Sequence, residues 1–162
     1  MKLLLVTFSD NADHQDTVFG MYEELRKDKD FDTYLLAIKT PKVPLKKSSH
    51  AWLVDCPKRP GITKGTFNLP LLHAIVKRVK DARFDVIWFE SLHVWNLPIM
   101  KVVKGKTHIY HVIHEVIPHE GDRQVKQVDF FNKVLVKLSD TIVLRNEKYI
   151  PAMVKRYGIS PD

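Results

Sequence analysis

The sequence predicts an α/β fold in which a doubly wound parallel sheet carries helices on both faces. Apolar, strand-like runs alternate with helix-like segments along the chain, and the connections between the runs are too long for hairpins, which favours parallel strands. The first run, KLLLVTF at 2–8, is continuously apolar rather than alternating, as in a strand covered on both faces. With 162 residues, the chain has the size of a single domain.

The expected strands are short apolar runs at 2–8, 31–38, 85–90, 107–113 and 140–144. Helices are expected where apolar residues recur at helical spacing, at 69–79, 97–103 and 125–138. In the last of these, the side chains predicted to point inward are Val128, Phe131, Leu135 and Leu138.

For two further helices, the sequence also predicts where the helix begins or ends. After a polar turn at 9–13, apolar residues recur from Val18 to Leu25 and predict a helix that ends near Asp30. The final helix is expected to begin at Asn146 as its N-cap and to stop at Gly158. Pro151 falls inside it and predicts a kink.

The composition indicates the cellular environment of the chain and the kinds of partner it can have. No apolar run approaches the roughly 20 residues that span a bilayer, and the first residues lack the pattern of a signal peptide. The predicted localisation is therefore the cytoplasm, and the basic charge of the chain adds the expectation of peripheral association at the inner face of the membrane. The lone Cys56 has no partner for an internal disulfide.

The chain is basic, with 26 lysines and arginines against 19 acids and a net charge of +7. Segment 39–64 is rich in lysine and proline and is predicted to be mostly loop. An anionic membrane surface is a predicted partner, with these residues in contact: Lys46, Lys47, Lys58, Arg59, Lys77 and Arg78. Nucleic acid would use the same charge, but no nucleic-acid-binding motif is present, and a solvated basic face is the plainer alternative.

Polar residues follow the predicted strands where a doubly wound sheet binds its ligands, outside the carboxyl ends of the strands. The candidate binding residues at this edge are Ser9, Asp10 and Asn11, then Glu90, Ser91 and His93, and finally His114 and Glu115. Each of them is also a residue type that caps helices or closes turns.

Other chemistries find less support in the sequence. The histidines at 108, 111, 114 and 119 do not suit one metal ion, because 108 and 114 lie about 20 Å apart on a strand and 111 points to the opposite face. A small site from His114, Glu115 and His119 stays open, but no metal is the prediction. No Gly-x-Ser-x-Gly elbow and no dinucleotide fingerprint is present.

The stretch HEVIPHEG at 114–121 resembles the His-Asp-x-x-Pro-His-x-Gly segment of retaining, sugar-nucleotide-dependent GT-B glycosyltransferases of family four. FDVIWFESLHVW at 84–95 and SDTIVLRNEKYIPAMVKRYGISPD at 139–162 are similar to strands of the same Rossmann-like N-terminal domain, in the same order. The resemblance covers nearly the whole chain.

This resemblance implies an acceptor-binding, Rossmann-like domain over 1–162 that faces a donor-binding domain absent from this sequence. His114 would then be catalytic, near the transferred sugar, Glu115 would orient the loop or contact the acceptor, and His119 would shape the turn. The co-substrate would be a nucleotide-sugar and no other cofactor is implied. Without the donor-binding domain, the chain is expected not to transfer sugar.

Three departures from the family pattern bear on these expectations. SDNADHQD at 9–16 replaces the Gly-rich loop that often lies near donor phosphates, Glu115 stands where Asp is usual, and the paired-glutamate segment is missing. The leading hypothesis is the acceptor-binding domain of an enzyme that builds a polysaccharide or glycolipid. The alternatives are a non-catalytic membrane- or partner-binding module, a basic nucleic-acid-binding domain and a metal-dependent hydrolase.

Overall fold

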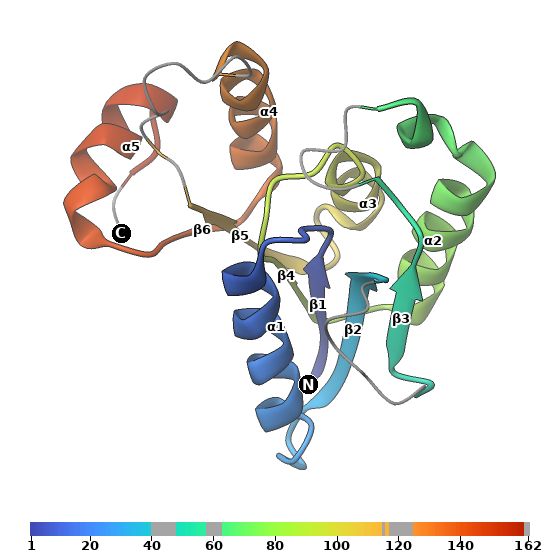
Figure 1. Ribbon diagram of the computed structural model, residues 1–162. Coiled ribbons are helices and arrows are strands. Elements are labelled where there is room, and N and C mark those ends of the chain that lie inside the picture. The colour runs from blue at the N-terminus through green and yellow to red at the C-terminus, as the bar shows by residue number, and fades with distance from the viewer. Residues whose placement is uncertain (40–47, 58–62, 115, 117–124, 161–162) are drawn as a thin grey trace.

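A computed structural model describes residues 1–39, 48–57, 63–114, 116 and 125–160. Within these residues, six strands form one sheet in the order β3-β2-β1-β4-β5-β6, and every neighbouring pair is parallel. Their bounds are β1 (Lys2–Thr7), β2 (Asp32–Ile38), β3 (Ala51–Val54), β4 (Val86–Phe89), β5 (His108–Ile113) and β6 (Thr141–Leu144). The predicted fold class is confirmed (Figure 1).

Helices cover both faces of the sheet. The helix α1 (Ala12–Leu25) packs on one face, against Leu3 and Leu5 of β1. The intervening residues Leu4 and Val6 point to the other face, into a core that includes α2 (Leu69–Ala82), α3 (Asn96–Val103) and α4 (Val125–Leu138). Connections on opposite faces follow from right-handed crossovers, because the chain moves in opposite directions from β1 to β2 and from β4 to β6.

The described chain closes with a short 3₁₀ turn, Glu147–Tyr149, and α5 (Ile150–Tyr157). Met153 of α5 is fully buried and packs with Ile113, Val116 and Val136 in a third cluster. The four residues predicted to point inward from α4 are confirmed, because Leu135 is buried in the main core and the other three pack against it.

Part of the segment predicted as loop is a strand. The strand β3 (Ala51–Val54) pairs with β2, and the backbone N–H of Leu35 donates to the carbonyl of His50 at 2.8 Å. Trp52 is buried, and the Arg78 guanidinium lies 3.8 Å from the centre of its ring. This strand was not predicted within the mostly-loop segment, because four residues, AWLV, give too little periodicity to stand out from their basic surroundings. A second short element, the 3₁₀ turn Lys64–Phe67, ends this segment.

Two helix ends in the structure also differ from those predicted from the sequence. The first helix stops at Leu25 rather than near Asp30, and it begins at Ala12, where the side chain of Asn11 accepts from the backbone N–H of Asp13. The last segment is a 3₁₀ turn followed by α5, with Pro151 in the first turn of the helix. Because a first-turn residue needs no backbone donor, this proline starts the helix instead of kinking it. The predicted stop at Gly158 is confirmed, with φ at +66°.

Two glycines give opposite predictions for stability. Gly105 has φ at +76°, a conformation that costs other residues about 1 kcal/mol, so Gly105→Ala should lower the free energy of unfolding by about that amount. Gly20 lies inside α1, and an added methyl group would meet nothing within 4 Å, so Gly20→Ala should raise it by up to about 1 kcal/mol. Urea unfolding at pH 7 measures both. Equal effects of the two variants would contradict the backbone assignment.

Candidate functional site

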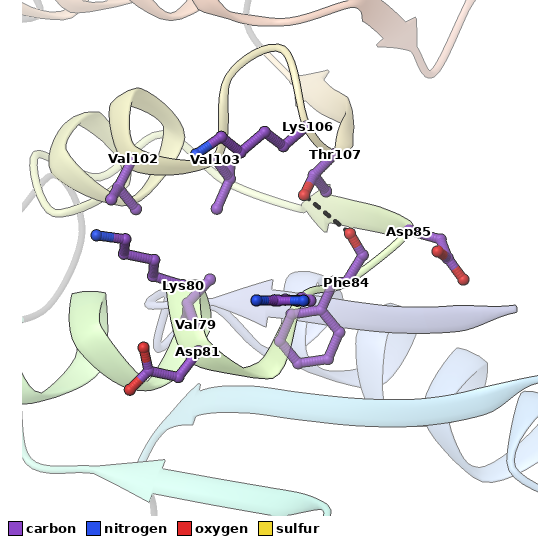
Figure 2. A pocket seen from close by; sticks show the side chains of 10 residues that line it. Val79, Lys80, Asp81, Phe84, Asp85, Val102, Val103, Lys106 and Thr107 are labelled. Atoms are coloured by element: carbon purple, nitrogen blue, oxygen red, sulfur yellow. Dashed lines mark hydrogen bonds between the residues drawn. The ribbon is translucent and has the colours of Figure 1, made fainter.

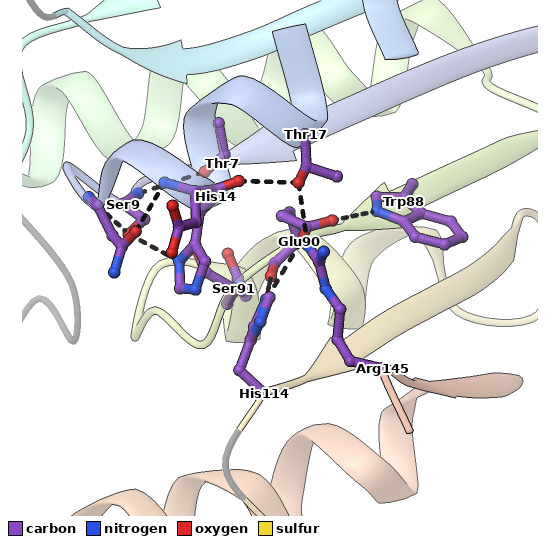
Figure 3. Close-up of polar contacts among 12 residues, drawn as sticks. Thr7, Ser9, His14, Thr17, Trp88, Glu90, Ser91, His114 and Arg145 are labelled. Carbon is purple, nitrogen blue, oxygen red and sulfur yellow. Dashed lines mark hydrogen bonds and ion pairs between the residues drawn. The ribbon is translucent and has the colours of Figure 1, made fainter. Parts of the chain in front are cut away.

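A polar cluster lies at the carboxyl ends of β4, β5 and β6, beside the start of α1 (Figure 3). The strand order reverses between β1 and β4, which is where doubly wound sheets bind ligands. Glu90, His114 and Arg145 each directly follow one of the three strands. We call these three residues the rim triad.

Glu90 is the centre of the rim triad. It is fully buried, and its backbone N–H donates to the carbonyl of Val6 on β1 at 3.0 Å. Its carboxylate accepts from the Trp88 indole N–H at 2.8 Å and from Arg145 Nη2 at 2.5 Å. His114 Nε2 lies 3.2 Å from the oxygen that Arg145 contacts. Three donors therefore surround one buried carboxylate.

These donors determine the charge of Glu90. Burial alone would raise the pKa of the carboxyl, but hydrogen bonds from His114, Trp88 and Arg145 hold the pKa below its ordinary value. The group is consequently a carboxylate at neutral pH. A buried, paired carboxylate is well suited to orient the side chains that donate to it.

Strand register explains why the three side chains meet. The sheet pairs the last residues of β5 and β6, so His114 and Arg145, one position further on, lie side by side. Successive side chains of a strand alternate between faces, which puts Glu90 on the same face as Trp88. That face is the one covered by α1, whose Thr17 hydroxyl accepts from Arg145 Nη2 at 3.1 Å.

The environment of His114 fixes its tautomer. Its Nε2 lies 2.6 Å from the carbonyl oxygen of Glu90, in addition to the carboxylate contact. Both neighbours are acceptors, so Nε2 carries a proton, and in the neutral form of the ring Nδ1 is the acceptor atom. The ring stacks on His14 of α1 with centroids 3.9 Å apart, and 15% of the side chain is exposed. His114 is therefore held rigidly yet stays accessible.

The predicted residues after β1 serve mainly to begin α1. Asn11 is its N-cap. Ser9 is buried, its hydroxyl lies 2.9 Å from His14 Nδ1, and its carbonyl accepts from the Gln15 side chain at 2.9 Å. Asp10 is exposed. Ser9 thus supports His14 and, through the stacked rings, His114.

The two predicted residues after Glu90 point into the protein. His93 is fully buried, accepts at Nδ1 from the Trp95 backbone N–H and donates from Nε2 to the carbonyl of Pro57 at 2.9 Å. Burial lowers its pKa to about 4. Ser91 is buried, and its hydroxyl has no hydrogen-bond partner in the described part of the chain. His93 is therefore held as part of the core.

Several predicted residues lie outside the described ranges. These are Glu115, His119, Lys46, Lys47, Lys58 and Arg59. Lys77 and Arg78 are described on the exposed side of α2, where Lys77 makes an ion pair with Asp81 and Arg78 lies over Trp52. Both basic side chains thus make contacts within the protein.

Four residues of the cluster were not predicted: His14, Thr17, Trp88 and Arg145. Arg145 carries a signal in the sequence, because it directly follows the apolar run of the last strand, as Glu90 and His114 follow theirs. His14 and Thr17 are part of a helix that begins earlier than its apolar periodicity indicates. The contact of Trp88 depends on the face to which β4 turns it.

Other chemistry is not evident among the described residues. They contain no group of three or more side chains arranged to hold a metal ion. Burial raises the pKa of the Cys56 thiol to about 12, so the thiolate needed for nucleophilic attack is scarce at neutral pH. No helix in the described ranges has the length and hydrophobicity to cross a bilayer.

A cavity of about 570 Å³ lies between the ends of α2 and α3. Its walls include Val79, Phe84 and Val103, with Lys80 and Lys106 beside them (Figure 2). Thr107 closes one side and donates its hydroxyl proton to the Phe84 carbonyl at 2.8 Å. This cavity is at the amino-terminal ends of β4 and β5, and it contains no residue of the rim triad.

Comparisons with known proteins give no family. No protein-family model matches the chain, and no curated protein matches it. Among solved structures, a protein of unknown function from Vibrio parahaemolyticus is similar at 12% sequence identity and a TM-score of 0.41, over 90% of this chain and 93% of that one.

Proposed function

We propose that the protein binds the acceptor of a glycosyltransferase, a glycan or glycolipid precursor, at the rim triad. It would be the N-terminal domain of a GT-B enzyme that uses a nucleotide-sugar as co-substrate. The observation that carries the proposal is the contact of His114 Nε2 with both the carbonyl and the carboxylate of buried Glu90. It coincides with HEVIPHEG, the segment with the family resemblance.

The contact with Glu90 determines which hydrogen bond His114 can form with a ligand. With its proton held at Nε2 by Glu90, the imidazole can accept a hydrogen bond at Nδ1 from a sugar hydroxyl. A carboxylate that fixes the tautomer and orientation of a histidine is the arrangement by which general bases are positioned. Stabilisation of the departing diphosphate, the other requirement of retaining transfer, would come from the donor-binding domain.

Glycan binding by the purified chain tests the proposal. A glycan array that includes lipid-linked oligosaccharides should show binding to a subset of glycans. His114→Ala should weaken that binding about tenfold or more, the value of one or two hydrogen bonds. His73→Ala is the matched control, because His73 is exposed on α2, away from the rim triad. Melting curves of all three proteins establish that each is folded.

Two outcomes would contradict the proposal. Binding that His114→Ala leaves unchanged would remove His114 from the site. Absence of glycan binding, together with salt-sensitive binding to anionic liposomes, would favour the alternative of a non-catalytic membrane- or partner-binding module.

A further inference from the structure

Arg145 stands at the outer side of the rim triad. Its guanidinium uses one nitrogen, Nη2, for both of its hydrogen bonds, to Glu90 at 2.5 Å and to Thr17 at 3.1 Å. Guanidinium has five N–H donors, and Nε and Nη1 make no hydrogen bond to the described residues. The side chain is 47% exposed. Arg145 is therefore anchored at one nitrogen, while about half of its side chain is exposed.

An anchored guanidinium with an open edge is a binding group for oxyanions. Two parallel N–H donors match the two oxygens of a carboxylate or phosphate, which gives such pairs both strength and directionality. Because Glu90 and Thr17 already fix the plane of the group, little side-chain entropy is lost when a ligand binds. The net charge of +7 also favours the approach of an anion.

The spacing of the sheet relates this edge to His114. His114 and Arg145 each follow the last register pair of β5 and β6, Ile113 and Leu144, and neighbouring strands lie about 4.8 Å apart. A pyranose ring with its substituents spans a similar distance. One sugar could therefore present an oxyanion to Arg145 and a hydroxyl to Nδ1 of His114.

We infer that the acceptor recognised at the rim triad carries an oxyanion, a sugar carboxylate or a phosphate, bound by the Nε and Nη1 edge of Arg145. This inference rests on the proposed function, because it names the class of acceptor for the same site. Neutral sugars would keep the hydroxyl contact with His114 but would lose the charge-assisted pair with Arg145.

Ligand titration followed by NMR tests the inference with three probes, D-glucuronate, D-glucose 6-phosphate and D-glucose. The wild-type chain should bind at least one anionic sugar about tenfold more tightly than glucose, as expected for one charge-assisted hydrogen bond. The two anionic probes distinguish a carboxylate from a phosphate. Equal affinity for charged and neutral sugars would overturn the inference.

Three variants test whether Arg145 causes the preference for anionic over neutral sugars. Arg145→Gln should abolish the preference for the anionic sugar, and Arg145→Lys should keep part of it, because the charge remains while the planar pair of donors is lost. Arg26→Gln is the control: Arg26 is 49% exposed, and its ion pair is with Glu23 on α1. A preference for the anionic sugar that survives in folded Arg145→Gln protein would overturn the inference. If the glutamine variant does not fold, an undiminished preference in Arg145→Lys would overturn it in the same way.

The titration also separates this inference from the proposed function. Binding of charged and neutral sugars with equal affinity, abolished by His114→Ala, would leave the acceptor site standing and remove only the oxyanion. Anionic sugars that bind through Arg145 but are indifferent to His114→Ala would keep the oxyanion site and remove the role of His114. No binding of any probe to the wild-type chain would overturn both.

Discussion

The free energy of unfolding should fall steeply between pH 6.5 and about pH 4, because two buried histidines must stay neutral in the folded chain. Burial lowers the pKa of His93 from 6.5 to about 4, and the Pro57 carbonyl offsets only part of this. Burial and the neighbouring His114 lower the pKa of His111 to about 4 as well, with a backbone contact to Phe89 acting in the opposite direction.

The sign follows from proton binding. Between pH 6.5 and about 4, the unfolded chain binds protons at both histidines and the folded chain does not, so stability rises with pH across this window. At about 1.4 kcal/mol per pH unit, each histidine contributes roughly 3 kcal/mol. Because small domains have only about 5–15 kcal/mol of stability, the two together bring the chain close to unfolding at pH 4.

A single substitution tests this prediction. Neither ring nitrogen of His111 makes a hydrogen bond of ordinary geometry to the described residues, so His111→Leu should preserve stability at pH 7 or increase it. The same variant should lose about half of the pH dependence, measured by urea unfolding at pH 7, 6, 5 and 4. His73→Leu, changed at an exposed position of α2, should retain the wild-type slope. An unchanged slope in His111→Leu would refute the assignment.

Much of the fold could be predicted from the sequence because strands such as β1 and β2 are mostly buried on both faces. A continuous run such as KLLLVTF is typical of a strand that is covered on both faces of a parallel sheet. The four residues of β3 could not be predicted in this way. Their strand character comes from pairing with β2 and from Trp52 packing under Arg78, and both contacts are made with residues distant in the sequence.

The candidate site was predictable to the extent that it depends on strand ends. Glu90 and His114 follow predicted strands and do meet at the rim. His93 follows the same strand as Glu90, but the chain turns inward there, and its imidazole contacts Pro57 and Trp95 instead. Periodicity locates the end of a strand, whereas the direction of the next loop depends on tertiary contacts.

Glu90→Gln should produce the second large effect, a loss of both stability and ligand binding. The amide replaces one acceptor oxygen with an N–H₂ group, which must face Trp88 or the shared contact with Arg145 and His114, all of them donors. An unpaired buried donor costs about 1–3 kcal/mol. Full loss of a buried charge partner costs more, but Arg145 is 47% exposed and can return to solvent. A loss of about 2–3 kcal/mol is therefore expected in urea unfolding at pH 7.

A second carboxylate provides the matched control. Asp129 of α4 also pairs with two cations, Arg156 at 2.7 Å and Lys133 at 3.0 Å, but its side chain is 20% exposed. Asp129→Asn should consequently cost less than about 1 kcal/mol and leave glycan binding intact.

In Glu90→Gln, His114 loses the carboxylate that holds its proton at Nε2, and glycan binding should weaken at least as much as in His114→Ala. Equal losses of stability in the two carboxylate variants would mean that burial at Glu90 adds nothing to the strength of its contacts. Full glycan binding by folded Glu90→Gln protein would mean that His114 does not depend on the carboxylate for its orientation.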